Sequence, residues 1–135
     1  MKIGHALKAA EFFYVRIEAD EDLFQCLEEA VRSKGIENAV IVTAIGSLRK
    51  AILVNPGSLA KPPEIGKKEW EGPWEIVSLT GALGKNHAHG GKMGHIHICL
   101  SRHDAPAIGG SLDYGNLAFY PIDVCLLGYQ GPLGL

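Results

Sequence analysis

The chain has 135 residues, of which 47% are hydrophobic and 21% are charged, and its formal net charge is -2. This size and balance predict one globular domain, residues 1–135, and exclude a global field that would draw the protein onto nucleic acid or an anionic membrane. The N-terminus lacks the apolar core of a signal peptide, and no run approaches the roughly 18 apolar residues that a membrane span needs.

Three widely spaced cysteines, Cys26, Cys99 and Cys125, lie within apolar patterns. An odd number of cysteines at such spacing favours reduced, buried thiols over a disulfide framework. We therefore expect the protein to be cytoplasmic.

The first part of the chain predicts a strand, a helix and two further strands. Residues 12–18 are aromatic and β-branched, which is typical of a strand. In the helix that follows, Asp20 is the expected N-terminal cap, and Gly35 is the expected left-handed residue at the C-terminal end. Residues 37–48 form a strongly β-branched run that indicates a strand buried on both faces, and residues 49–55 indicate its partner.

The next segment, residues 55–73, is rich in proline and glycine and predicts a long surface loop of functional or interfacial character. Strands resume at Trp74, and Pro121 indicates an edge position or a bulge within the last of them. The expected strands cover residues 74–83, 95–101, 106–112 and 117–127. One helix with about seven strands predicts an α+β domain on a mainly antiparallel sheet, whose edges self-association would cover.

Five of the six histidines lie between residues 85 and 103. On a strand alternate residues share a face, so His95, His97 and Cys99 should point away from the core. Two imidazoles at this spacing can converge on one divalent metal ion, zinc above all, but a zinc site needs three or four ligands. The further candidates are His87, His89, His103, Asp104 and a residue of a neighbouring subunit.

An ordinary structural explanation also fits these residues. The two strand histidines would then belong to an exposed polar face, and His87 and His89 would be solvated turn residues. Cys99 would be a small buried hydrophobe rather than a ligand. The sequence leaves both explanations open.

Acidic residues are absent between Ile76 and His103, while Lys85, Lys92 and Arg102 are present. This segment predicts a positive local field and an anionic ligand, with Lys92 and Arg102 as the anion-binding residues. The alternative is that acids are missing only because the strands are buried.

Four motifs in order, GSL (46–48), WEIVSLTGAL (74–83), GHIHICLS (94–101) and AIGGSL (107–112), resemble the plant and prokaryote conserved domain, the PPC domain. The resemblance covers about residues 12–128 and leaves 129–135 as a tail. It implies a mainly antiparallel sheet with flanking helices, assembled as a homotrimer.

Prokaryotic members of that family often pair the His-x-His strand with a later Gly-Gly-His, and the three histidines look like a metal site. Here His95 and His97 match the first two, and Ser111 stands in the third place. Because a serine hydroxyl is a poor zinc ligand, we hypothesise that His87 and His89 replace the missing imidazole.

These observations predict a homotrimeric binding domain whose histidine-rich face holds a metal ion, an anionic small molecule, or both. The alternative is a metal-dependent enzyme acting on a small anionic substrate, with His89, His103 or Asp104 as general acid or base. Prokaryotic relatives are commonly labelled as candidate DNA-binding proteins, yet this sequence has no Arg-Gly-Arg-Pro hook. Direct DNA binding is therefore not expected.

Overall fold

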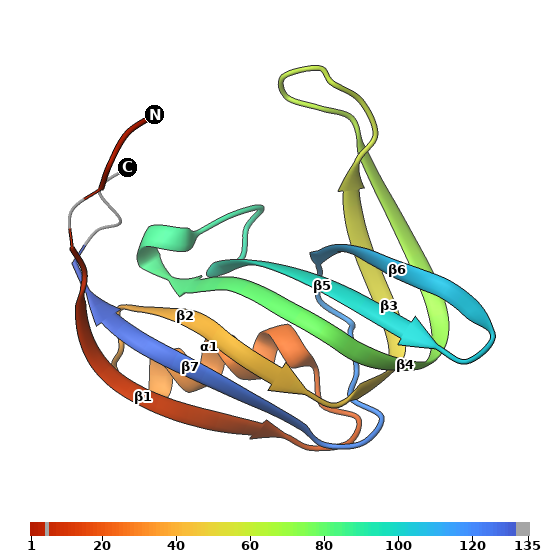
Figure 1. Cartoon of the computed structure of the whole chain (residues 1–135), viewed down its shortest axis with the longest axis horizontal. Helices are drawn as coiled ribbons and strands as arrows, with labels where there is room; N and C mark the ends of the chain where they lie inside the picture. The colour runs from red at the N-terminus through yellow and green to blue at the C-terminus, as the bar shows by residue number, and fades with distance from the viewer. Residues whose placement is uncertain (5, 132–135) are drawn as a thin grey trace.

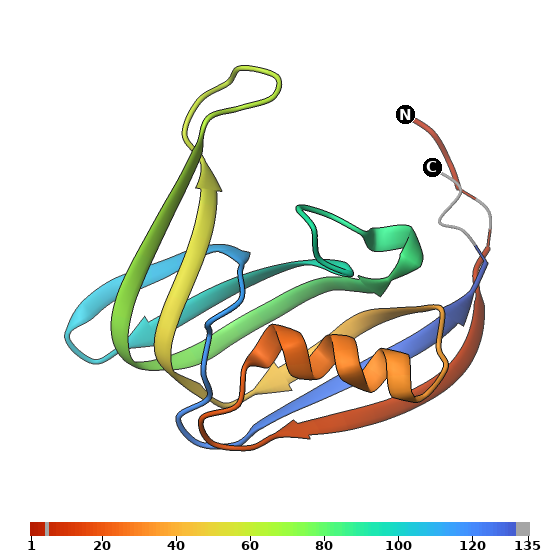
Figure 2. The same cartoon turned by 180° about the vertical axis from the view of Figure 1, so that it is seen from behind.

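A computed structural model of the protein describes residues 1–4 and 6–131, so part of the predicted tail, residues 132–135, lies outside the described residues (Figure 1). Seven strands form one sheet in the order β1-β7-β2-β4-β3-β6-β5, and every pair of neighbours is antiparallel. One helix, α1 (Leu23–Ser33), packs across one face of β1, β7 and β2 (Figure 2). The predicted α+β class is confirmed. The strands are β1 (Lys8–Ile17), β2 (Asn38–Ile45), β3 (Ser47–Pro56), β4 (Ile65–Gly84), β5 (Gly94–Arg102), β6 (Ala105–Leu112) and β7 (Ile122–Gln130).

Strand β4 is 20 residues long and pairs with different partners along its length. Its first half pairs with β3 and its second half with β5, while β6 pairs with both β5 and β3. Strands β3 to β6 thus form a closed ring of pairings. The outer end of the β3–β4 hairpin, residues 54–66, projects beyond this ring and is called the arm below (Figure 1). No helix within the described ranges is long and apolar enough to cross a membrane.

The predicted loop over residues 55–73 is wrong for most of its length, because only residues 57–64 connect β3 to β4. Gly72 and Pro73 lie at a bulge, where the register shifts between Leu48 and Lys50. A Cβ atom on Gly72 would stand 2.6 Å from the carbonyl oxygen of Arg49. The bulge lets glycine and proline occupy β4 without ending it.

Two smaller boundary predictions also need correction. Asp22, not Asp20, caps α1, and its Oδ1 accepts a hydrogen bond of 3.0 Å from the backbone N–H of Gln25. Asp20 instead has a φ of 69° and pairs with Arg49. Pro121 precedes β7 rather than lying inside it, so it removes no hydrogen bond from the ladder.

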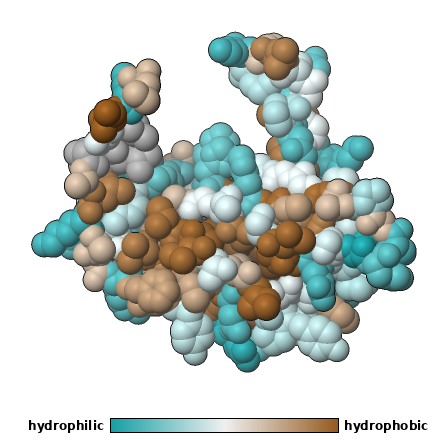
Figure 3. Space-filling view, in the orientation of Figure 1, coloured by the Kyte–Doolittle hydropathy of each residue, from teal (hydrophilic) through white to brown (hydrophobic). Residues whose placement is uncertain are grey.

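The two faces of the sheet differ in how they are covered. The inner face packs against Leu23, Phe24, Leu27 and Val31 of α1, which are all buried. The other face, called the outer face, is uncovered. Phe12 is 65% exposed and Ile45 is 73% exposed, and apolar residues gather over β1, β7 and β2 in Figure 3. The prediction that residues 37–48 are buried on both faces is therefore wrong within one chain, because α1 covers only one face.

All three cysteines are free, as expected, but each is half-buried rather than buried. Cys99 and Cys125 come from β5 and β7 and belong to the outer-face positions of those strands.

Candidate functional site

The histidine pair, His95 and His97, lies on the outer face of β5. Ile96 and Ile98 between and beside them are buried on the inner face, so the predicted alternation is confirmed. The two Nε2 atoms are 3.2 Å apart, and the rings are nearly perpendicular, at 81°. The two imidazoles therefore converge at their outer nitrogen atoms.

Strand register connects this pair to the exposed apolar surface. Residues that face each other across a ladder share a side of the sheet, and successive ladders place five residues in one row. The row runs across β1, β7, β2, β4 and β5 and consists of Phe12, Leu127, Val40, Ala82 and His95. The histidine pair and the uncovered apolar surface thus occupy the same side of the molecule.

Ser111 faces His97 directly across the β5–β6 ladder. A side chain at position 111 therefore stands beside the histidine pair, where the resemblance implied a third imidazole. The hydroxyl of Ser111 is a poor ligand for zinc, so a third ligand for an ion at this pair would have to come from another element.

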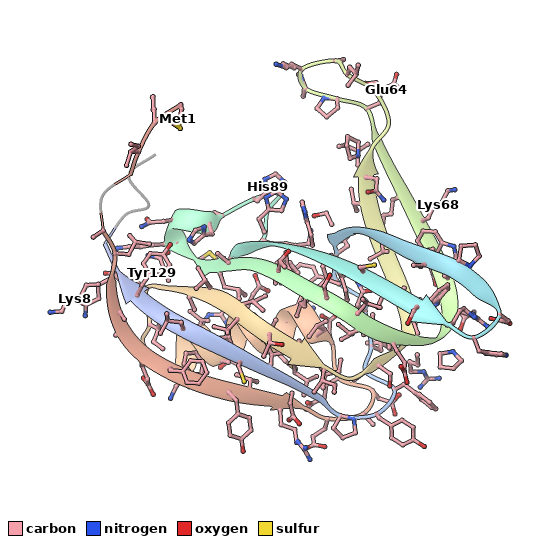
Figure 4. All side chains as sticks on the ribbon, in the orientation of Figure 1. Met1, Lys8, Glu64, Lys68, His89 and Tyr129 are labelled. Carbon is pink, nitrogen blue, oxygen red and sulfur yellow. The ribbon has the colours of Figure 1, made fainter. Side chains whose placement is uncertain are left out.

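His89 comes from the turn between η1 (Lys85–His87) and β5. His89 and Lys92 exchange two backbone hydrogen bonds of 3.0 Å, and Gly90 and Gly91 between them have φ of 58° and 81°. Two left-handed residues in a two-residue turn define a type I′ hairpin, for which glycine is well suited. The His89 ring stacks on His95, with centroids 3.8 Å apart. In Figure 4, His89 lies on the side of the sheet from which the arm, marked by Glu64, projects.

A buried carboxylate holds the base of this turn. Glu28 of α1 accepts hydrogen bonds of 2.8 Å from the backbone N–H of Met93 and from the hydroxyl of Tyr114. Lys92 lies over the Tyr114 ring, 5.0 Å from its centroid, and its Nζ is 2.9 Å from Asp113. The helix on the inner face thereby fixes the loop that carries His89.

Sequence reasoning missed Glu28, Tyr114 and Asp113. One signal was available, because Glu28 adjoins Leu27 on the buried stripe of α1, and a glutamate is almost never buried there without a partner. Partial burial pushes the pKa of Asp113 upward, but hydrogen bonds from Lys92, the Tyr114 backbone and Lys67 outweigh it and lower this pKa to about 2.

The other predicted ligands lie elsewhere. His87 contacts the hydroxyl of Tyr129 on β7, and burial lowers its pKa. His103 is exposed at the β5–β6 turn, and Asp104 beside it pairs with Arg102. None of these residues lines the cavity around the histidine pair. The structure thus brings His89 to the pair and leaves His87 apart, and it removes His103 and Asp104 as neighbouring acids or bases.

The expected positive field is largely neutralised, because the fold brings an acid to each basic residue of the segment. Lys85 lies 3.1 Å from Glu37, and Arg102 lies 2.6 Å from Asp104. Arg102 also stacks over Trp74 and donates to the carbonyl of Glu71 at the far end of β5. Lys92 and Arg102 line different cavities, so the two predicted anion-binding residues do not converge.

A cavity of about 730 Å³, called the cleft below, lies between the histidine pair and the arm. Burial, followed by the influence of His89 and His97, lowers the pKa of His95. The ring is therefore neutral near pH 7, which is the form that binds metal ions. The cleft is lined by Val54, Asn55, Pro56, Pro62, Pro63, Ile65, His89, His95, His97, Gly110 and Ser111.

The spacing of the histidine pair fits a metal ion. Two nitrogens that each lie 2.0–2.1 Å from one tetrahedral zinc ion stand about 3.3 Å apart, and the observed Nε2 separation is 3.2 Å. His89 is stacked beside the pair rather than aimed between the two nitrogens. Within residues 1–4 and 6–131, no group of three or more His, Cys, Asp or Glu side chains is arranged to hold a metal ion.

The fold and this site define an antiparallel α+β domain with an open histidine face. The chain matches the sequence model of the Plants and Prokaryotes Conserved (PCC) domain over residues 4–129. It therefore belongs to that family, the PPC family whose motifs the sequence resembles.

Individual relatives agree with this assignment. A metal-containing protein from Archaeoglobus fulgidus is 30% identical, with a TM-score of 0.79 over 98% of this chain and 89% of its own. A PPC protein from Pyrococcus horikoshii is 22% identical, with a TM-score of 0.76 over 96% of this chain and 86% of its own. AT-hook motif nuclear-localized protein 14 of Arabidopsis thaliana is 31% identical over 132 residues, which are 96% of this chain but only 30% of the plant protein.

Proposed function

We propose that this protein is a homotrimeric, cytoplasmic binding protein whose cleft holds a divalent metal ion, zinc above all, and through it an anionic small molecule. The observation that carries the proposal is the 3.2 Å separation of the His95 and His97 Nε2 atoms on an open face. A bound ion would supply the positive charge that the paired side chains of Lys92 and Arg102 do not.

His89 is the proposed third ligand, in place of the histidine that the family resemblance implies at position 111. Its ring already contacts His95, and a turn held by Glu28 carries it. The relative from Archaeoglobus fulgidus, at 30% identity, is described as metal-containing. That description supports a metal in this chain without identifying the ion.

The homotrimer is proposed to cover the outer face. Exposed apolar side chains of β1 and β2 gather there (Figure 3), and β2 has the apolar pattern of a strand buried on both sides. Apolar surface of this extent on one face commonly marks an interface. Because the row that begins at Phe12 ends at His95, association would bring neighbouring copies close to the cleft.

Direct DNA binding is not part of the proposal. The described lining of the cleft contains no lysine or arginine, and the basic residues of β5 and its flanking turns are paired with acids. A phosphate backbone requires several free cations along one surface. A gel shift with random duplex DNA at low salt should therefore show no complex at micromolar protein.

Zinc stoichiometry of the untagged protein tests the proposal. We expect one zinc per chain after dialysis, and loss of zinc in His97→Ala but not in the exposed control His103→Ala. We expect His89→Ala to weaken zinc at least tenfold, and Ser111→His to restore zinc binding in the His89→Ala background. Absence of stoichiometric metal, or equal loss with His103→Ala, would contradict the proposal.

A further inference from the structure

The walls of the cleft divide into two chemical halves. The arm contributes an apolar wall, made of Val54, Pro56, Pro62, Pro63 and Ile65. The sheet and the turn contribute a polar floor, made of His89, His95, His97 and Ser111, and Asn55 of the arm adds one more polar side chain to the lining. A volume of about 730 Å³ falls in the range of cavities that enclose small organic ligands.

The charge of the lining limits the charge of the ligand. In the part of the chain that the structure describes, no Asp, Glu, Lys or Arg lines the cleft. Lys92 lines only the adjoining cavity of about 230 Å³, and its Nζ is already 2.9 Å from Asp113. With no basic side chain in the described lining, the proposed metal ion would be the charge available in the cleft. A polyanion would leave charges without partners there, whereas a single carboxylate would be neutralised by that ion.

The arm has apolar surface that a ligand could bury. Ile65 is 63% exposed although it lines the cleft. Proline rings beside it are rigid, so covering them costs little conformational entropy. A ligand with an apolar body would remove this wall from water while its polar end contacts the imidazoles.

We propose that the cleft binds an apolar monocarboxylate, with the carboxylate at the histidine floor and the hydrocarbon body against the arm. This inference rests on the proposed function, because the metal ion is the charge that the carboxylate would meet. It adds the chemical class of the ligand, which excludes polyanions such as nucleoside diphosphates and triphosphates.

A homologous series of linear carboxylates, from acetate through butyrate and hexanoate to octanoate, tests the inference by calorimetric titration of the zinc-loaded full chain. The affinity should rise about fourfold per methylene until the apolar wall is covered. Octanoate should bind more tightly than pyrophosphate, and 1-octanol should bind more weakly than octanoate.

Matched variants locate the effect. Ile65→Thr should flatten the dependence on chain length, whereas Leu59→Thr should leave it intact, because Leu59 is 99% exposed at the arm tip and does not line the cleft. Phe12→Thr is a second control, for adsorption of hydrocarbon to the outer face. A flat series, or equal effects of all three variants, would overturn the inference, as would a neighbouring copy that fills the cleft and prevents binding.

Zinc content measured on the same samples distinguishes a failure of this inference from a failure of the proposed metal site. Zinc-loaded protein with a flat series refutes this inference alone and leaves the metal site standing. Protein that takes up no zinc refutes the proposed function, and this inference falls with it.

Discussion

The two faces of the sheet differ in how their apolar side chains are shielded from water. On the inner face, α1 buries Leu23, Phe24 and Leu27 against the strands, and the fold is complete within one chain. On the outer face, Phe12 remains 65% exposed in the same row as His95. The inner face therefore determines whether the chain folds, whereas the outer face carries the proposed assembly and the candidate site.

The largest expected loss of stability comes from a substitution on the inner face. Leu27→Ala removes a fully buried side chain and should lower the free energy of unfolding by about 2–5 kcal/mol. On the outer face, Val42→Ala should cost less than about 1 kcal/mol in the monomer, because Val42 lies in an exposed bulge of β2. Urea denaturation of both variants at one protein concentration measures the difference, and equal losses would contradict the contrast.

A charge on the outer face should break assembly and spare the fold. Phe12→Asp places a carboxylate in the apolar row, and burying it unpaired would weaken association at least about hundredfold. Sedimentation velocity should show a monomer with an unchanged circular dichroism spectrum, while Phe12→Leu stays trimeric. A Phe12→Asp variant that remains a trimer would show that another surface associates.

Glu28 connects the helix on the inner face to the turn that carries His89, and a substitution there should weaken this connection. Glu28→Gln keeps the shape but loses a charged acceptor for Met93 and Tyr114, which should cost about 1.5–3 kcal/mol. We expect faster amide exchange at residues 88–93 and weaker zinc binding, with the core strands still protected. If exchange in that turn is unchanged, Glu28 does not position His89.

Protonation of His95 gives a smaller effect with a definite sign. Because burial lowers the pKa of His95 in the folded protein, the unfolded chain takes up protons first as the pH falls below about 6.5. Stability is full above that pH and decreases from there toward the lower folded pKa. Between about pH 7.5 and about pH 5.5, the urea midpoint of the metal-free parent protein should fall more than that of metal-free His95→Gln. Parallel curves would contradict this account.

Much of this contrast could be predicted from alternation along the strands. The pattern of β5 places Ile96 and Ile98 inward and the histidine pair outward, because side chains alternate with a period of two. The continuation of β4 through residues 65–73 could not be predicted in this way. Gly72 and Pro73 are turn residues locally, and only their bulge opposite Arg49 keeps them within β4.

Only part of the candidate site could be predicted from the sequence, for a similar reason. The positive field between Ile76 and His103 was inferred only from residues that are neighbours along the chain. In the folded protein, Glu37 forms an ion pair with Lys85, and Asp113 forms one with Lys92. His89 and His87 look alike in sequence, and tertiary contacts direct one to His95 and the other to Tyr129. Local sequence patterns do not show which side chains from distant parts of the chain will come into contact.

An anomalous difference map collected at the zinc absorption edge, from crystals of the untagged chain, tests the central claim most directly. We predict one peak per chain about 2.0–2.1 Å from the Nε2 atoms of both His95 and His97, with His89 turned to complete the shell. A map without a peak between those two nitrogens, or with the metal at His87 or His103 instead, would contradict the account.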